Sequence, residues 1–208
     1  MPRLMDMGLD RLNSLLLEMA TMSENAVASA IKAYEKGGKA TEVRDWAERL
    51  QTQHRQVSDI SMELLARFQP VASDLRLIKA CFEISYGFFR YGRYAKDIVE
   101  VLDMFGDLSR CDHTMVTETA KKTQEMIRMS IDAFARRDVA LARQVPRMDD
   151  FVDDRYRKHL KGVMQGKGDL RCALSAVLIL RYLERISDHA TYIAESVDYI
   201  VTGIEPPA

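Results

Sequence analysis

The feature of this sequence that most limits its possible folds is an apolar residue that recurs at alternating spacings of four and three. The pattern runs through residues 172–200 and again through residues 77–105. With 47% hydrophobic residues in the chain, nine apolar residues in nine positions arise by chance about once in a thousand registers. Such long seams are typical of helices that pack at shallow angles in a bundle. The seam positions are Cys172, Ala176, Ile179, Leu183, Ile186, Ala190, Ile193, Val197 and Ile200, and Leu77, Cys81, Ile84, Phe88, Tyr91, Ala95, Ile98, Leu102 and Phe105.

Helix-breaking residues divide the chain into six predicted helices. Gly37, Pro70 and Gly106 each end a helix, and Asp169 is suited to cap the start of the last one. Pro146 lies inside the predicted fifth helix, where it either kinks the helix or begins it. No segment alternates with the period of two expected of a strand, so the predicted fold class is all-α. The helices are predicted over about residues 8–36, 41–69, 71–105, 107–136, 138–165 and 169–202.

The two seams belong to an internal repeat. At a shift of 95 residues, Asp74-Leu75-Arg76 recurs as Asp169-Leu170-Arg171. Two amphipathic helices can align by chance, but a repeated polar triplet argues against that explanation. We therefore predict a tandem duplication of a three-helix unit, with one repeat over residues 1–106 and the other over residues 107–208. Further matches at this shift are Arg90 with Arg185, Ala95 with Ala190, Ile98 with Ile193, Glu100 with Glu195 and Asp103 with Asp198.

Composition excludes several classes of protein. The net charge is −1, which argues against a dominant nucleic-acid-binding surface. The longest apolar run, Ala176–Leu180, is far too short to insert into a membrane, and the N-terminal segment lacks the apolar core of a signal peptide. Cys81, Cys111 and Cys172 are odd in number and far apart, so we expect no disulfide framework and a reducing cytoplasm.

Two pairs of carboxylates are spaced so that they can meet. Glu184 and Asp188 lie four residues apart on one face of the predicted sixth helix, away from its seam. Asp149 and Asp153 have the same spacing on the predicted fifth helix, which a short loop makes an antiparallel neighbour. Four like charges in one place repel unless a cation neutralises them, and a hard cation with oxygen ligands does so.

Spacing alone leaves a second explanation open, because charged helix faces are usually solvated. In that case the acids pair with Arg147, Arg181 and Arg185. His189 follows Asp188 directly, but its ring points away from the axis of the acidic pair. No HExxH, GxSxG or glycine-rich phosphate loop occurs. A metal-dependent helical enzyme that uses the four carboxylates is the alternative to a binding protein.

Three stretches together carry a resemblance to a known family. Residues 181–195, which read RYLERISDHATYIAE, closely resemble the signature of the PhoU family of phosphate uptake regulators. Residues 149–156 (DDFVDDRY) resemble that family's preceding motif, and residues 69–76 (QPVASDLR) resemble a hallmark of its first half. The resemblance spans essentially the whole chain. It implies two three-helix bundles related by a pseudo-twofold axis.

The resemblance also implies a function. PhoU-like proteins are regulatory adaptors, not established enzymes, that control phosphate uptake and repress the phosphate-starvation response. The expected partners are the ATPase subunit of a phosphate ABC transporter, a membrane histidine kinase and a second copy of the chain. The expected location is the cytoplasm, at the inner face of the membrane through these partners. An adaptor for a different transporter that shares the bundle is a further alternative.

Some family members bind metals on the bundle surface through acidic motifs. Asp149, Asp153, Glu184 and Asp188 occupy these motif positions in the second repeat, where iron or zinc is favoured by the resemblance and magnesium or manganese is the alternative. The first repeat has His54, Ser58, Phe89 and Arg93 at the equivalent positions. None is a carboxylate, so the resemblance predicts one metal site in the second repeat and none in the first. Tyr192 stands where the family usually has asparagine.

The altered motif of the first repeat can serve another purpose. Tyr86 and Phe89 fall off the seam, and Arg93 lies beside them. Exposed aromatic residues next to arginine are typical of protein interfaces. We therefore predict an interaction surface at Tyr86, Phe89 and Arg93, which contacts either a second copy of the chain or the transporter. The competing explanation is that these residues pack against the second helix of the same repeat.

Overall fold

Six long helices and one single-turn helix build the chain in the computed structural model, which describes residues 4–166 and 168–205. No strand occurs within those ranges, so the predicted all-α class is confirmed. The elements are α1 (Leu4–Lys36), α2 (Glu42–Phe68), α3 (Ala72–Phe105), α4 (Thr114–Arg136), α5 (Val139–Ala142), α6 (Pro146–Met164) and α7 (Leu170–Thr202). In the same part of the chain, no helix is both long and apolar enough to cross a membrane.

Local chemistry sets several helix ends where the sequence predicts them. Gly106 follows α3 with a φ of +66°, a conformation that costs glycine little. The Asp169 carboxylate accepts a hydrogen bond of 3.0 Å from the Cys172 backbone N–H and so caps α7. Pro146 begins α6 and does not kink a longer helix, because its missing N–H is no loss in a first turn.

Two predicted boundaries are wrong. The fourth helix begins at Thr114 and not at residue 107. Residues 106–113, here called the inter-repeat linker, form turns in which the carboxylates of Asp107 and Asp112 each accept a backbone N–H at 2.9 Å. Such local hydrogen bonds compete with helix formation. The predicted fifth helix is divided as well, because Asp138 caps the short α5 before Pro146 starts α6.

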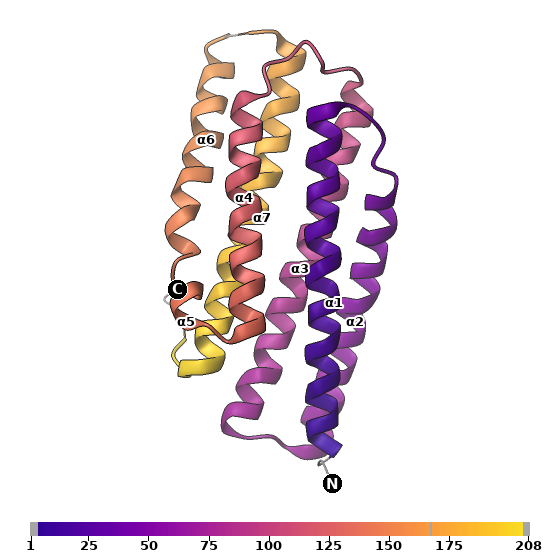
Figure 1. The fold of residues 1–208 in the computed structure, drawn as a ribbon, viewed down its shortest axis with the longest axis vertical. Helices are drawn as coiled ribbons and strands as arrows, with labels where there is room; N and C mark the ends of the chain where they lie inside the picture. Colours follow the sequence, from indigo (N-terminus) through magenta and orange to yellow (C-terminus); the bar gives the residue numbers. More distant parts are fainter. Residues whose placement is uncertain (1–3, 167, 206–208) are drawn as a thin grey trace.

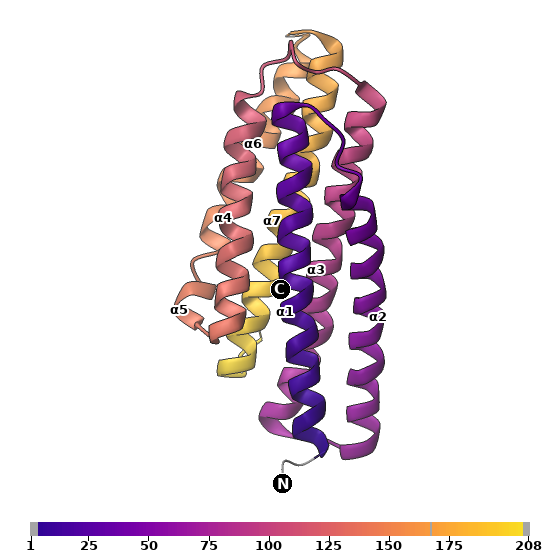
Figure 2. The same cartoon turned by 45° about the vertical axis from the view of Figure 1, so that its right-hand side comes forward.

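The helices form two three-helix units that lie side by side (Figure 1). The first unit contains α1, α2 and α3, and the second contains α4, α6 and α7. The central helices α3 and α7 pack against each other, and α1 packs against α4 beside them (Figure 2). Both seams are buried or partly buried along their whole length, as predicted.

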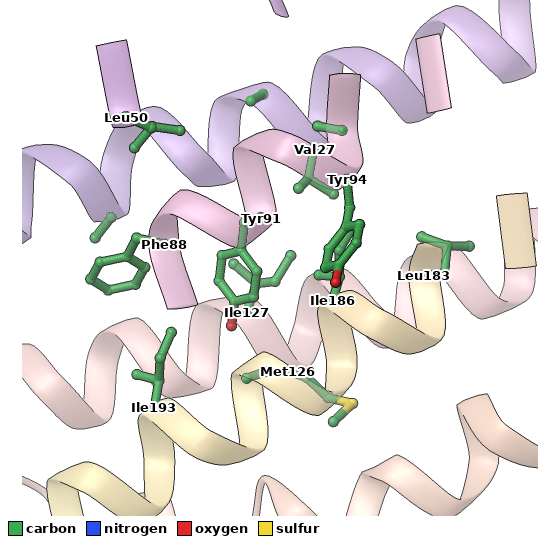
Figure 3. Close-up of a cluster of buried hydrophobic side chains, with 14 of the residues drawn as sticks. Val27, Leu50, Phe88, Tyr91, Tyr94, Met126, Ile127, Leu183, Ile186 and Ile193 are labelled. Carbon is green, nitrogen blue, oxygen red and sulfur yellow. The ribbon is translucent and has the colours of Figure 1, made fainter. Parts of the chain in front are cut away.

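The two units share one hydrophobic core. Figure 3 shows Phe88 and Tyr91 of α3 among side chains of α4 and α7, including Ile127 and Ile193. All four of these side chains are fully buried. At Gly87 the helices α3 and α7 are so close that an added Cβ would lie 2.7 Å from Cδ1 of Ile193. The units are therefore not independent in packing, although each repeats the same three-helix pattern.

Equivalent residues of the two repeats meet where α3 crosses α7. Tyr94 and His189, which are 95 residues apart, stack with ring centroids 6.0 Å apart and an interplanar angle of 29°. The equivalent arginines Arg90 and Arg185 both donate a hydrogen bond to the Tyr94 hydroxyl. This meeting of equivalent positions is what a pseudo-twofold axis between α3 and α7 produces, and it agrees with the predicted duplication.

The expectation that the cysteines stay unpaired is wrong for two of them. Cys111 in the inter-repeat linker and Cys172 in the first turn of α7 form a disulfide across 61 residues of sequence, with Cα atoms 5.5 Å apart. Cys81 is a free thiol in the core. Sequence spacing gave no sign of this bond, because it depends on how the linker folds back onto α7.

Candidate metal centre

Three carboxylates from two helices converge between α6 and α7. Asp153 on α6 and Glu184 and Asp188 on α7 each offer an oxygen, and these oxygens lie within 4.8 Å of one another. The spacing of four residues puts Glu184 and Asp188 on the same face of α7, and α6 packs against that face. The predicted meeting of the acidic residues therefore occurs for these three. Their side chains are only 12–24% exposed.

Asp149 lies one turn before Asp153 on α6 and falls outside the group of three. Its Oδ1 is buried and has no hydrogen-bond partner. Burial raises the pKa of Asp149, and the charges of Asp188 and Asp153 add to that rise. Asp149 therefore lies close enough to be affected by the negative charges of the cluster, although it stands at the cluster's edge.

Burial and mutual repulsion both act against ionisation of this cluster. Burial raises the pKa of Glu184 to about 7, with a further contribution from the charge of Asp188. Burial likewise raises the pKa of Asp188, and Arg185 opposes that rise. Oε2 of Glu184 is buried without a hydrogen-bond partner. Buried oxygens without partners are costly, and a bound cation would satisfy them.

Each of the three converging carboxylates has its own arginine. Arg157 contacts Asp153 at 2.5 Å, Arg181 contacts Glu184 at 2.5 Å, and Arg185 contacts Asp188 at 2.9 Å. Arg181 and Arg185 were expected in this role, whereas Arg157 takes the place predicted for Arg147. The position of Arg157 four residues after Asp153 was the signal in the sequence that could have identified it.

This arrangement fits a hard or intermediate divalent cation. Carboxylate oxygens from two facing helices are suitable ligands for magnesium, manganese, iron or zinc. The unpartnered oxygens of Glu184 and Asp149 show that the cluster retains acceptor capacity after its arginine contacts are counted. The residues present therefore fit the metal that the resemblance implies, with arginines as competing counter-ions.

His189 does not belong to the carboxylate cluster. Its side chain is buried, and its ring contacts those of Tyr86, Tyr94 and Tyr192 at centroid distances of 5.5–6.0 Å. Burial, together with the positive charges of Arg90 and Arg185, lowers its pKa to about 4. Tyr192, the residue that departs from the family pattern, is half exposed and covers one edge of this imidazole.

Arg185 connects the carboxylate cluster with the first repeat. Its guanidinium donates a hydrogen bond of 2.9 Å to Asp188 and another of 3.3 Å to the Tyr94 hydroxyl on α3. Arg90 donates to the same hydroxyl from the side of the first repeat. One arginine therefore contacts both a candidate metal ligand and the interface between the repeats.

The equivalent place in the first repeat has different chemistry. His54 lies 2.9 Å from the Ser85 hydroxyl and stacks on Phe89 with ring centroids 5.7 Å apart. The Arg93 guanidinium pairs with Asp97 at 3.1 Å. Ser58 donates its hydroxyl to the backbone carbonyl of His54. Nothing in these contacts brings carboxylates together as in the second repeat.

The three residues of the predicted interaction surface differ in exposure. Tyr86 is 41% exposed and Arg93 is exposed, whereas Phe89 is half-buried on His54 of α2. Phe89 therefore packs against the second helix, as the competing explanation requires. Tyr86 and Arg93 are the residues that a partner can reach.

Comparisons with known proteins agree on one family. The sequence pattern of the PhoU domain matches residues 16–102 and 116–197. A phosphate-specific transport system accessory protein PhoU homolog of Pseudomonas putida is 32% identical over 95% of this chain and 80% of its own length. The crystal structure of PhoU from Pseudomonas aeruginosa superimposes with a TM-score of 0.87 at 32% identity, covering 96% of this chain and 99% of the other. A PhoU structure from Streptococcus pneumoniae, at 20% identity, has the same fold with a TM-score of 0.77 and covers 98% of this chain and all of the other.

Proposed function

Because this chain belongs to the PhoU domain family, we propose that it is a regulatory accessory protein of a phosphate transport system and acts by binding and not by catalysis. The observation that carries this proposal is the match of the family pattern to both repeats, together with a relative of that name that is 32% identical over 95% of the chain. Binding that depends on the conformation of a partner is sufficient for regulation.

The finer proposal names the partners. The chain binds the ATPase subunit of a phosphate ABC transporter and holds a membrane histidine kinase in its non-signalling state, in the cytoplasm and as a homodimer. The two repeats offer unlike surfaces for this purpose. The second repeat presents the carboxylate cluster with its arginines, and the first presents Tyr86 and Arg93.

Affinity capture tests this role. Tagged protein is isolated from cells grown with high and with low phosphate, and the co-purifying proteins are identified. We expect a phosphate-transporter ATPase that is enriched in one of the two conditions. A double variant, Tyr86→Ala with Arg93→Ala, should lose capture about tenfold or more, because exposed aromatic and arginine residues dominate interfaces. Arg128→Ala, on the outside of α4, is the matched control. Capture of a different transporter, or of neither partner in either condition, would contradict the proposal.

We further propose that Asp153, Glu184 and Asp188, with Asp149 at the edge, hold a divalent metal ion. Asp188→Asn should weaken binding of zinc, ferrous or manganous ion by about 10–100-fold, because it removes one charged ligand. Asp154→Asn is the control, since the Asp154 side chain is 82% exposed and lies outside the cluster. Titration calorimetry on chelator-treated protein measures both. Equal affinities of the two variants for every metal would contradict a site at this cluster.

The arginine partners should oppose metal binding. Arg181→Gln removes the cation that contacts Glu184 at 2.5 Å, and the Arg181 side chain is 44% exposed. Exposed ion pairs contribute little, so we expect metal affinity to rise only about two- to fivefold. The same titration with Arg128→Gln, whose partner Glu24 lies outside the cluster, should give the wild-type affinity. A lower affinity in Arg181→Gln would show that this arginine supports the site and does not compete for it.

A further inference from the structure

The Cys111–Cys172 bond joins the inter-repeat linker to the first turn of α7. Cys111 lies in the inter-repeat linker, which joins the end of α3 to the start of α4, and Cys172 lies in the first turn of α7. Beside the bond, the Arg171 guanidinium donates to the Phe105 carbonyl at the end of α3, and a Cβ added to Gly106 of the linker would lie 3.3 Å from that guanidinium. Among the described residues, the disulfide is the covalent connection between the linker and α7, so its state affects how firmly the two are attached.

Both cysteines have surroundings that favour reaction. Each of the two residues is partly exposed, whereas a core cysteine is not. Cys172 is the third residue of a 33-residue helix, where the backbone N–H groups stabilise a thiolate. An arginine directly precedes each cysteine, Arg110 before Cys111 and Arg171 before Cys172. The carboxylate of Asp169 is already engaged by the Cys172 N–H, which limits its repulsion of a thiolate.

Cys81 provides the contrast within the same chain. It is 1% exposed, in the core, and burial raises the pKa of its thiol to about 12. A buried neutral thiol of this kind is inert toward oxidants. The paired cysteines thus differ from Cys81 in exposure, in charge environment and in their distance from a second sulfur.

From these observations we propose that Cys111 and Cys172 are a reversible oxidation site. The oxidised pair attaches the inter-repeat linker to α7, and the reduced pair releases it. The Cys172 thiolate attacks one oxygen of hydrogen peroxide, which breaks the O–O bond, forms a sulfenic acid and releases hydroxide. The Cys111 thiol then attacks the sulfenic sulfur, which forms the disulfide and releases water. Peroxide accepts both electrons. A dithiol reductant reverses the reaction by exchange and is itself oxidised to a disulfide. This site is independent of the proposed role in phosphate transport.

Alkylation of the full chain tests the proposal. The protein is reduced with a dithiol, freed of reductant and exposed to graded hydrogen peroxide. It is then denatured and treated with a maleimide, so that every remaining thiol including Cys81 is labelled, and the labelled peptides are identified by mass spectrometry. We expect the dithiol to reduce the Cys111–Cys172 bond without denaturant. Peroxide should then abolish labelling of Cys111 and Cys172 together, at a rate at least about tenfold higher than the rate at which Cys81 is oxidised. A peptide pair linked through residues 111 and 172 should appear in parallel.

A second measurement reports on the linker itself. Hydrogen exchange in residues 106–113 should become faster on reduction and return to its earlier rate after peroxide. Oxidised protein should melt about 5–10 °C above reduced protein. Cys81→Ser should keep this response, whereas Cys111→Ser and Cys172→Ser should each abolish it. The proposal would be overturned if the dithiol reduced the bond only after the protein unfolds, or if the bond did not re-form in peroxide. Both outcomes can be measured on the wild-type protein without any variant.

Discussion

Replacing Phe88 by alanine is expected to lower the free energy of unfolding by about 3–5 kcal/mol. The Phe88 ring is fully buried and packs edge to face with Tyr91 on its own helix and with Phe134 on α4, at centroid distances of 6.1 and 6.5 Å. Truncation leaves a cavity where the two repeats share their core. Because that core is continuous, both repeats should unfold in one transition at a lower urea concentration.

Two spectroscopic probes test whether both repeats unfold in one transition. Circular dichroism follows the helices of both repeats, and fluorescence follows Trp46 in α2, the one tryptophan of the chain. The two curves should coincide in wild type and variant. Phe151→Ala is the matched control, because Phe151 is 37% exposed beside Arg155 and should cost less than about 1 kcal/mol. Equal losses in the two variants would contradict the expected cost of the Phe88 cavity, and curves that separate would contradict unfolding of both repeats in one transition.

The second large effect concerns Glu184 and pH. Burial raises the pKa of this carboxyl in the folded protein to about 7 from an ordinary value of 4.5. Below pH 4.5 both folded and unfolded chains keep the proton. Between 4.5 and 7 only the unfolded chain releases it, so stability falls as pH rises and stays lower above pH 7. This shift corresponds to about 3 kcal/mol. In chelator, Glu184→Gln should therefore be more stable than wild type at pH 8, but not at pH 4.5.

The comparison of wild type and variant at each pH isolates Glu184 from the other shifted groups. Burial also raises the pKa of Asp149 and Asp188, but those carboxyls are present in both proteins. Glu48→Gln, at an exposed position of α2, serves as the control for the chemical change from glutamate to glutamine. Urea unfolding from pH 4.5 to 8.5 is the measurement. A difference between Glu184→Gln and wild type that does not change with pH would contradict the raised pKa.

The architecture could be predicted from the sequence because its determinants are local and repeated. Spacings of four and three determine which face of each helix is buried. Gly106 ends a helix, and Pro146 and Asp169 each mark the start of one, through the local chemistry of these residues. The predicted fourth helix included most of the inter-repeat linker, because the order of apolar and polar residues over residues 107–113 is compatible with a helix. Only the turns made by Asp107 and Asp112 show that the chain is not helical there.

The candidate site was predictable to the extent that it depends on helical spacing. Glu184 and Asp188 must share a face, and an antiparallel neighbour must bring Asp153 near them. The choice of Arg157 over Arg147 also follows from helical spacing, because Arg157 lies four residues after Asp153 on α6, and that signal was overlooked. The pairing of Cys111 with Cys172 depends instead on a tertiary distance, because packing brings together two segments that are 61 residues apart in the chain.

The contact between Tyr94 and His189, which occupy equivalent positions in the two repeats, has a consequence for the symmetry of the molecule. A single three-helix unit that covered its central helix by pairing with an identical copy would form an isologous dimer, whose two sides are identical and related by the twofold axis. Fusion of the two units into one chain removes that constraint. Tyrosine can face histidine, and an acidic cluster can be kept on one side while aromatic and basic residues occupy the other. The two sides of the molecule thereby become unlike, and each presents a surface of its own.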